Sequence, residues 1–322
     1  MEPLLQVRDL HVDYDLLTAG PVHALQGVDF AIREGESLGV LGESGCGKST
    51  LAATIMGLLP RQASVTRGSV RLGGRELVGL KEKELRSLRG AKLELIHQEP
   101  ALALNPVRRV GEQVADVVRA HVPGDRASAI QHAQEMLARV SLAGERYFRA
   151  YPHQLSGGQR QRVVIAQALV CRPALVTADE PTSSLDSTTQ AEILALLKGL
   201  RQDMGISLLL ISHDPAVLAT LCHRVLVIYA GKIVEQGSLP DVYCRPRHPY
   251  TQALLSLMAS RQGENGNGVL PTIPGQPPNM LQLPSGCSFE PRCSERFEAC
   301  AARAPEEVEE GERRVRCLKY GG

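Results

Sequence analysis

The 322-residue sequence contains no tryptophan, and aromatic residues make up only 3% of it. Proteins that bind single-stranded nucleic acid stack the bases on aromatic side chains, so this scarcity argues against such a surface. The 36 lysines and arginines nearly balance the 35 aspartates and glutamates, which leaves a net charge of +1. Because nucleic acids are bound largely through excess positive charge, we expect no nucleic-acid partner.

Long apolar runs are also missing from the sequence. The longest ones have the length of a strand and fall short of the roughly 18 residues that a membrane-spanning helix needs. The N-terminal segment MEPLLQVRDL has no basic stretch followed by a long apolar core, which is the pattern of a secretion signal. We therefore expect a cytoplasmic chain that takes part in any membrane process through partner subunits.

A phosphate-binding loop is the first motif that the sequence contains. The string GESGCGKST at residues 42–50 matches G-x-x-x-x-G-K-[ST] and follows an apolar, strand-like run at residues 37–41. We expect a sharp turn into a helix near Lys48, with backbone N–H groups and the helix N-terminus directed at phosphate oxygens, and with the Ser49 hydroxyl suited to Mg²⁺. The residues expected at this loop are Gly42, Glu43, Ser44, Gly45, Cys46, Gly47, Lys48, Ser49 and Thr50.

Two carboxylates supply the other half of a phosphoryl-transfer site. A strand-like run at residues 174–178 ends in Asp179, which we expect to hold Mg²⁺, and Glu180, which we expect to orient or deprotonate the attacking water. Without a phosphate loop, a solvated turn would be the simpler interpretation. A further apolar run at residues 206–211 precedes His213, which we expect at the same edge of a parallel sheet, where its imidazole can hydrogen-bond a γ-phosphate.

A third string, LSGGQ, lies between the phosphate loop and the strand that ends in Asp179. A good helix-forming segment follows it at residues 160–169. The string consists of Leu155, Ser156, Gly157, Gly158 and Gln159. Its serine and glycines are expected at a helix N-terminus, which favours an anion. In this order the three strings resemble the nucleotide-binding subunits of ABC transporters over essentially the whole chain. The resemblance implies that LSGGQ binds the ATP held by a second ATPase subunit.

The same resemblance assigns three further residues. Tyr14 is similar to the aromatic residue that stacks on adenine, although its alternating surroundings also suit an ordinary strand residue. Gln98 is similar to the loop glutamine near Mg²⁺, and Asp186 belongs to a loop that links the two active sites of a dimer. The resemblance thus implies ATP and Mg²⁺ as cofactors, with Ser49 and Gln98 close to the metal.

These motifs predict an α/β fold, a P-loop NTPase cassette of the ABC type. It should have a parallel-sheet core, an antiparallel β subdomain that includes residues 68–72, and a helical subdomain at about residues 98–165. We expect the cassette at residues 1–258 and a small cysteine-rich C-terminal extension at residues 259–322, after a linker at residues 261–279 that is rich in Gly, Asn and Pro.

The resemblance also places a groove for a cytoplasmic helix of a membrane subunit beside the helical subdomain. Residues 101–106, an apolar segment that ends in proline shortly after Gln98, lie where that groove would be. An ordinary exposed loop is the alternative interpretation.

Four of the eight cysteines fall near the C-terminus, at Cys287, Cys293, Cys300 and Cys317. Cytosolic thiols stay reduced, so clustered cysteines favour metal coordination over disulfides. Zinc sites usually contain short C-x2–4-C pairs, which this tail lacks, while longer loops can surround an iron–sulfur cluster. The spacing alone leaves an iron–sulfur cluster, zinc and no metal open.

The tail, at residues 247–254 and 287–293, resembles the C-terminal extension of the ATPases of dipeptide and oligopeptide importers, some of which carry a [4Fe–4S] cluster on four such cysteines. The resemblance implies that cluster, and an ATPase that drives di- or oligopeptide import from the cytoplasmic face of the inner membrane. The implied partners are a sister ATPase in a heterodimer, two membrane permease subunits and an extracytoplasmic substrate-binding protein. Importers of nickel chelates, opines or glycosides, and a soluble ABC ATPase without a transport role, are the alternatives.

Overall fold

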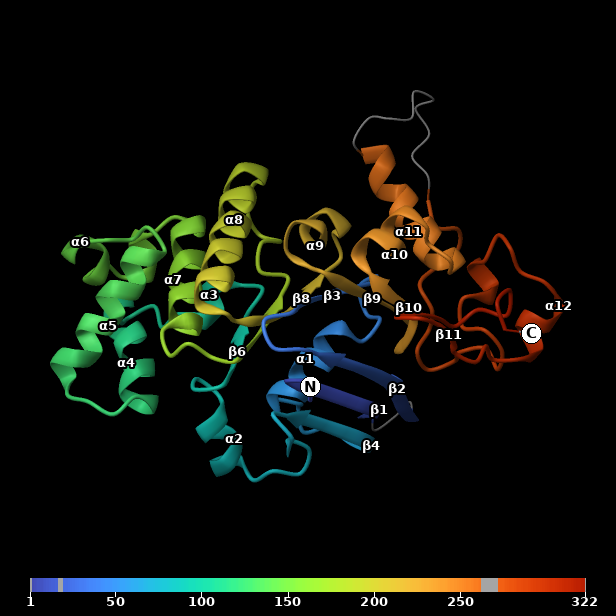
Figure 1. The fold of residues 1–322 in the computed structure, drawn as a ribbon, viewed down its shortest axis with the longest axis horizontal. Helices are drawn as coiled ribbons and strands as arrows, with labels where there is room; N and C mark the ends of the chain where they lie inside the picture. The colour runs from blue at the N-terminus through green and yellow to red at the C-terminus, as the bar shows by residue number, and fades with distance from the viewer. Residues whose placement is uncertain (1, 17–19, 262–271, 322) are drawn as a thin grey trace. The chain divides into compact units, whose positions relative to one another are not determined.

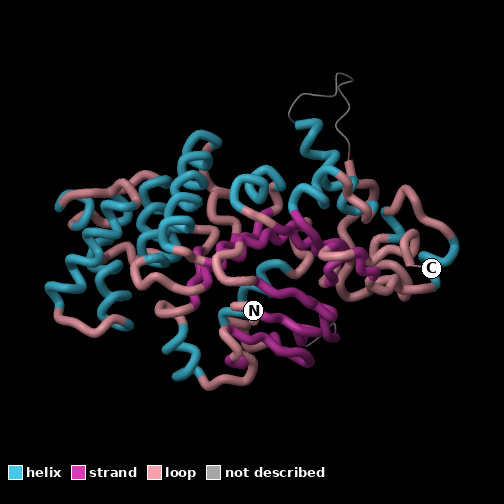
Figure 2. The backbone as a smooth tube through the Cα atoms, in the orientation of Figure 1, coloured by secondary structure: helices cyan, strands magenta, loops and turns pink. Residues whose placement is uncertain are grey.

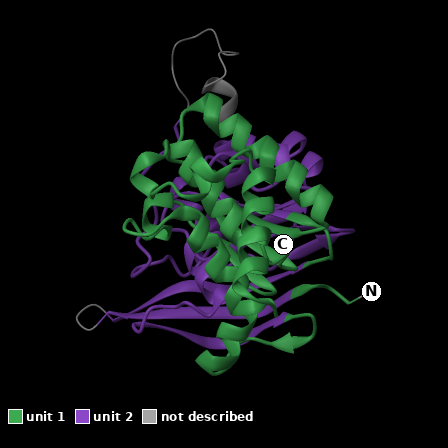
Figure 3. Ribbon diagram, turned by 90° about the vertical axis from the view of Figure 1, so that its left-hand side faces the viewer, with its two compact units in different colours: residues 1–5, 32–37, 72–210 green, residues 6–31, 38–71, 211–322 purple. Residues whose placement is uncertain are grey.

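The computed structural model describes residues 2–16, 20–261 and 272–321. Contacts within the chain divide it into two compact units, which Figure 3 distinguishes by colour. Unit 1 comprises residues 1–5, 32–37 and 72–210, and unit 2 comprises residues 6–31, 38–71 and 211–322. Each unit therefore combines segments that are far apart in the sequence.

Unit 2 contains the expected antiparallel β subdomain, in which β2 (Gly20–Ile32), β1 (Leu5–Leu16) and β4 (Ala63–Leu72) lie side by side (Figure 1). The buried residues of β1 alternate as Leu5 and Val7, then as Leu10 and Val12. The alternation of buried residues changes phase between Val7 and Leu10, around Asp9, whose φ of +43° is left-handed. Apolar side chains therefore remain on one face on both sides of the irregularity.

The second sheet of unit 2 carries the core strand that leads into the phosphate loop. Strand β3 (Ser37–Leu41) is buried along its length and runs parallel to β9 (Arg224–Tyr229), as expected for a strand covered on both faces. Beyond β9 the pairing becomes antiparallel, through β10 (Lys232–Ser238), β12 (Arg313–Val315) and β11 (Val308–Glu310). The helices of this unit are α1 (Lys48–Met56), α9 (Pro215–Leu221), α10 (Leu239–Cys244), α11 (Pro249–Arg261), η2 (Glu290–Arg292) and α12 (Glu298–Ala302).

Unit 1 contains the parallel strands β6 (Leu93–Ile96) and β7 (Leu175–Asp179), with β8 (Ser207–Ser212) next to β7. The segment between β6 and β7 folds into helices joined by loops (Figure 2). Within the helical subdomain expected at about residues 98–165, helices α4 (Val110–His121) and α5 (Arg126–Arg139) pack on each other and on α7 (Gly157–Leu169). The remaining elements of the unit are β5 (Arg75–Glu76), α2 (Glu82–Leu88), α3 (Pro100–Ala103), α6 (Glu145–Phe148), η1 (Pro152–Gln154) and α8 (Ser187–Met204).

No helix within the described residues is both long enough and apolar enough to cross a bilayer. Of the linker expected at residues 261–279, residues 262–271 lie outside the described residues.

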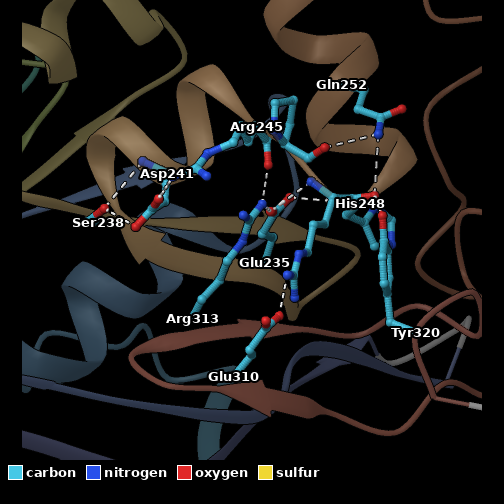
Figure 4. A network of polar contacts seen from close by, with 11 residues as sticks. Glu235, Ser238, Asp241, Arg245, His248, Gln252, Glu310, Arg313 and Tyr320 are labelled. Carbon is cyan, nitrogen blue, oxygen red and sulfur yellow. Dashed lines mark hydrogen bonds and ion pairs between the residues drawn. The ribbon is translucent and has the colours of Figure 1, made fainter.

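A completely buried carboxylate on β10 joins the C-terminal strands to the rest of unit 2 (Figure 4). Glu235 accepts hydrogen bonds from Arg313 Nη2 at 2.7 Å and from the backbone N–H groups of Arg247 and His248 at 2.9 and 3.0 Å. Removing one partner of such a buried pair typically costs about 3–5 kcal/mol, because the remaining charge is left uncompensated. The network therefore fixes β12 against β10.

We predict that Glu94 makes the stability of the protein depend on pH. Burial on β6 raises the pKa of Glu94 from 4.5 to about 7, so the folded protein holds this proton more tightly than the unfolded chain does. Ionisation of Glu94 therefore lowers the free energy of unfolding. This loss of stability is absent below pH 4.5, grows as the pH rises, and is complete above about pH 7. Glu94→Gln should therefore raise the melting temperature at pH 8 but not at pH 4.

Thermal unfolding followed by circular dichroism at the two pH values measures this difference. Glu135→Gln, at an exposed position on α5, is the matched control and should change neither melting temperature. A Glu94→Gln variant whose melting temperature differs from the wild-type value equally at both pH values would contradict the prediction.

Candidate functional site

The phosphate loop forms the expected sharp turn between β3 and α1. A β-carbon added at Gly42 would lie 2.4 Å from the carbonyl oxygen of Ile228, and one added at Gly47 would lie 2.6 Å from that of Ala24. Gly45 and Gly47 also have left-handed φ angles of +80° and +108°. Close packing against neighbouring strands, together with the turn itself, thus requires glycine in this loop.

The Lys48 side chain binds back to the backbone of the phosphate loop. It is almost completely buried, and its Nζ donates to the carbonyl oxygens of Gly42 and Glu43, both at 2.8 Å. Helix α1 begins at Lys48, and no described side chain caps its first turn, which contains no acidic residue. Uncapped N–H groups, a positive helix end and a buried lysine fit the phosphates of ATP.

Of two further residues expected at the nucleotide, one lies in the first turn of α1 and the other contacts that turn from β1. Ser49 is exposed in the first turn, where its hydroxyl is accessible to a hard cation such as Mg²⁺. Tyr14, on β1, places its hydroxyl 3.3 Å from Oγ1 of Thr50. The structure thus brings Tyr14 to the phosphate-loop helix, while its stacking on adenine stays a prediction.

The backbone N–H of Glu43 is bound within the protein, whereas the sequence motif predicts that the N–H groups of this loop point at phosphate oxygens. Its N–H donates to the hydroxyl of Tyr250 at 2.9 Å, and the N–H of Cys46 donates to the Glu43 carbonyl at 3.4 Å, so these two N–H groups already have acceptors within the protein. The Glu43 carboxylate pairs with Arg292. Sequence reasoning missed Tyr250 and Arg292 because neither belongs to a nucleotide motif.

In unit 1, the parallel pairing of β6 with β7 brings Gln98 and Glu180 together. Ile96 is opposite Ala178 in the register, so the two strands end at one edge, and Gln98 Nε2 lies 3.5 Å from Glu180 Oε2. Glu180 also has a left-handed φ of +46°. This conformation costs a non-glycine residue about 1–2 kcal/mol, and such strain concentrates at functional sites.

The LSGGQ string forms the N-terminus of α7, as expected. Ser156 is the N-cap: its hydroxyl accepts from the N–H of Gln159 at 3.3 Å, and Gln159 Oε1 accepts from the N–H of Ser156 at 3.0 Å. A β-carbon on Gly158 would lie 2.5 Å from Thr189 Cγ2 on α8, and Leu155 is buried. The string therefore has a clear structural role at this helix end, which also suits an anion.

Asp186 and His213 both lie next to helix N-termini. Asp186 caps α8, and the N–H and hydroxyl of Thr189, at 3.0 and 2.7 Å, lower the pKa of its carboxyl group. His213 lies in unit 2, between the last residue of β8 and Asp214, which caps α9. Its position next to the carboxylates of unit 1 stays a prediction.

The predicted [4Fe–4S] cluster is not supported by the structure, and this prediction is corrected. Cys287, Cys293, Cys300 and Cys317 do line one cavity of unit 2, but among the described residues no three His, Cys, Asp or Glu side chains form a group that could hold a metal ion. The four cysteines are free thiols. Burial raises the pKa of the Cys287, Cys293 and Cys317 thiols.

The glycine-lined loop, the buried lysine and the two carboxylates at the end of a core strand are the features of a phosphate-loop ATP-binding cassette. A family model described as "ABC transporter" matches residues 25–183, and one described as "Oligopeptide/dipeptide transporter, C-terminal region" matches residues 234–300. The chain belongs to the ABC transporter family, and it is an ATPase.

Curated relatives match nearly the whole chain. The "Oligopeptide transport ATP-binding protein OppD" of Escherichia coli is 43% identical over 99% of this chain and 94% of its own length. The "Dipeptide transport ATP-binding protein DppD" of Bacillus subtilis is 43% identical over 93% of this chain and 89% of its own length.

A solved structure confirms the cassette fold. The dimeric "post-hydrolysis state of the ATP-binding cassette MJ0796 bound to ADP and Pi" is 30% identical, with a TM-score of 0.65, and covers 73% of this chain and 98% of its own. The expected parallel core, antiparallel subdomain and helical subdomain are thus confirmed.

We predict that alanine at Gly47 destabilises the protein far more than alanine at Gly45. Both positions have positive φ, which costs a non-glycine residue about 1–2 kcal/mol, but the β-carbon at Gly45 meets nothing within 4 Å while that at Gly47 meets backbone. Urea unfolding should show a loss of about 1 kcal/mol for Gly45→Ala and about 3 kcal/mol or more for Gly47→Ala. Equal losses would show that close packing does not determine this position.

Proposed function

We propose that this chain is the ATP-hydrolysing subunit of an importer of di- or oligopeptides. The observation that carries the proposal is the match of residues 234–300 to the C-terminal region of oligopeptide and dipeptide transporters, together with relatives named for peptide transport along nearly the full length. A family model for the cassette alone, at residues 25–183, would leave the cargo open. The tail therefore favours peptides over nickel chelates, opines or glycosides.

In this proposal the phosphate loop and Lys48 bind the phosphates of ATP, and Tyr14 stacks on adenine. Ser49, Gln98 and Asp179 would hold Mg²⁺, which neutralises phosphate charge when bound. Glu180 orients or deprotonates the attacking water, and His213 hydrogen-bonds the γ-phosphate. The 3.5 Å contact of Gln98 with Glu180 supports their shared site.

A second cassette completes each site in the proposed mechanism. The LSGGQ residues at the start of α7 would bind the nucleotide held by a sister ATPase, and Asp186 would link the two sites. The name of the MJ0796 structure, which describes a dimer with ADP and Pi, supports this arrangement. The free energy that ATP contributes to closing such a dimer is limited to the difference between its binding free energies for the closed and the open states.

The further partners would be two membrane permease subunits and an extracytoplasmic substrate-binding protein, with this chain at the cytoplasmic face of the inner membrane. Leu102 on α3 and Val107 after it are 81% and 79% exposed. Large apolar side chains at such exposure, just after Gln98, suit a membrane subunit that covers them. We assign the cassette to residues 1–258 and the extension to residues 259–322.

We predict that Glu180→Gln lowers ATP turnover by at least about 100-fold, because the amide cannot act as a base. Binding of ATP should remain, and two ATP-bound chains should stay associated in size-exclusion chromatography. Phosphate release measured on the intact complex tests the first statement. Glu135→Gln is the control and should turn over like the wild type, while wild-type turnover in Glu180→Gln would refute the assignment.

We also predict that Leu102→Asp separates the chain from its membrane subunits. A charge at a position that becomes buried on docking is costly unless it is paired. Native mass spectrometry of the complex, purified through a tag on this chain, should find two membrane subunits, a sister ATPase and a copurified peptide ligand for the wild type, and no membrane subunits for the variant.

Leu58→Asp, at a position that is 46% exposed beyond α1, is the matched control and should keep the complex intact. A wild-type preparation without any membrane subunit would favour a soluble ABC ATPase instead. A metal chelate or a sugar on the binding protein would retain the transporter and change its cargo.

A further inference from the structure

A partly buried ion pair joins the phosphate loop to the C-terminal region within unit 2. Arg292, the last residue of η2, is only 6% exposed, and its Nη1 and Nη2 lie 2.7 and 3.0 Å from the two carboxylate oxygens of Glu43. A bidentate pair of this kind combines charge with fixed geometry and is stronger than a single neutral hydrogen bond. Glu43 directly follows the first glycine of the loop.

Arg292 is held firmly on its own side of the pair. Its Nε donates to the carbonyl of Pro274 at 3.0 Å, and its Nη1 lies 3.4 Å from the Tyr229 hydroxyl. A β-carbon on Gly275 would lie 3.3 Å from Arg292 Cγ, so the backbone of that turn packs against the arginine stem. The guanidinium therefore has little freedom to move with Glu43.

Glu43 is held through its backbone as well. Its N–H donates to the hydroxyl of Tyr250, a completely buried residue whose ring packs on those of Tyr229 and Phe289, with centroids 4.6 and 5.4 Å apart. Both the side chain and the amide of one loop residue are thus bound by residues from the C-terminal part of the chain.

A carboxylate in this position raises an electrostatic problem. The loop and the N-terminus of α1 suit an anion, yet a negative Glu43 within the same loop would repel it. The charge of Arg292 offsets that of Glu43, and the hydrogen bonds between them hold the carboxylate at the guanidinium. Without the arginine, the uncompensated charge would act on any phosphate in the loop.

We propose that Arg292 is a positioning residue for the phosphate loop: it neutralises the Glu43 carboxylate and holds it in place, so that affinity for ATP depends on the C-terminal region. This inference rests on the proposed role of the loop in ATP binding. A purely structural pair would instead anchor the tail without affecting the nucleotide, and the two readings differ in their response to removal of both charges.

The test measures ATP affinity by equilibrium titration, and KM and kcat by phosphate release, on the full chain in its complex. Arg292→Gln should weaken ATP binding and raise KM on the order of tenfold, as expected for one uncompensated charge a few ångströms away, with a much smaller change in kcat. The additional change Glu43→Gln removes the repelling charge and should restore the affinity to about the wild-type value, since ATP then meets no unpaired carboxylate. The defect of Arg292→Gln should also shrink at high salt.

Arg296→Gln is the matched control, because Arg296 lies in the same segment and pairs with Glu290 at an exposed site. It should leave the affinity unchanged. Wild-type affinity in Arg292→Gln, or a double variant as weak as Arg292→Gln, would overturn the proposal, and melting temperatures separate either result from misfolding. Lys48→Ala tests the proposed role of the loop separately. If Lys48→Ala binds ATP like the wild type, the proposed role of the loop in ATP binding is wrong. If Lys48→Ala loses ATP binding while Arg292→Gln binds ATP normally, only the inference about Arg292 is rejected.

Discussion

The close approach of backbone to backbone at the phosphate loop is the constraint on which the rest of the structure depends. Gly42 and Gly47 leave no room for a β-carbon, because the carbonyl groups of Ile228 and Ala24 occupy that space. The loop is therefore positioned by β9 and β2 as well as by its own turn. Lys48 then completes a compact shell by donating to the loop carbonyls, so the N-terminus of α1 remains directed at the position that an anion would take.

Much of this arrangement could be predicted because it depends on local sequence. Apolar runs at residues 37–41, 174–178 and 206–211 correspond to β3, β7 and β8, since a buried parallel strand needs apolar residues on both faces. The helix start at Lys48 was equally predictable from its motif. The left-handed conformation of Glu180 was not, because it arises from the way the turn after β7 closes on Ser183, and no residue preference marks it.

For the four C-terminal cysteines, the prediction made from local sequence was wrong. Their spacing brings all four to one cavity, which a sequence can suggest, but whether a metal can be shared depends on how the sulfur atoms are separated and charged. Loop lengths in a sequence do not report either quantity. The spacing of the four cysteines therefore does not by itself predict a metal site. The pair of Arg292 with Glu43, separated by 249 residues, was likewise beyond any motif.

The C-terminal region is connected to the phosphate loop by a continuous series of contacts within unit 2. Glu235 fixes β12 to β10, and β10 pairs with β9, whose Ile228 carbonyl limits Gly42. Tyr250 and Arg292 reach the same loop directly at Glu43. Two independent routes thus converge on adjacent loop residues, one through backbone packing and one through charge. Because backbone packing acts at Gly42 while the ion pair acts on the neighbouring carboxylate, the shape of the loop and its electrostatic potential depend on different contacts within unit 2.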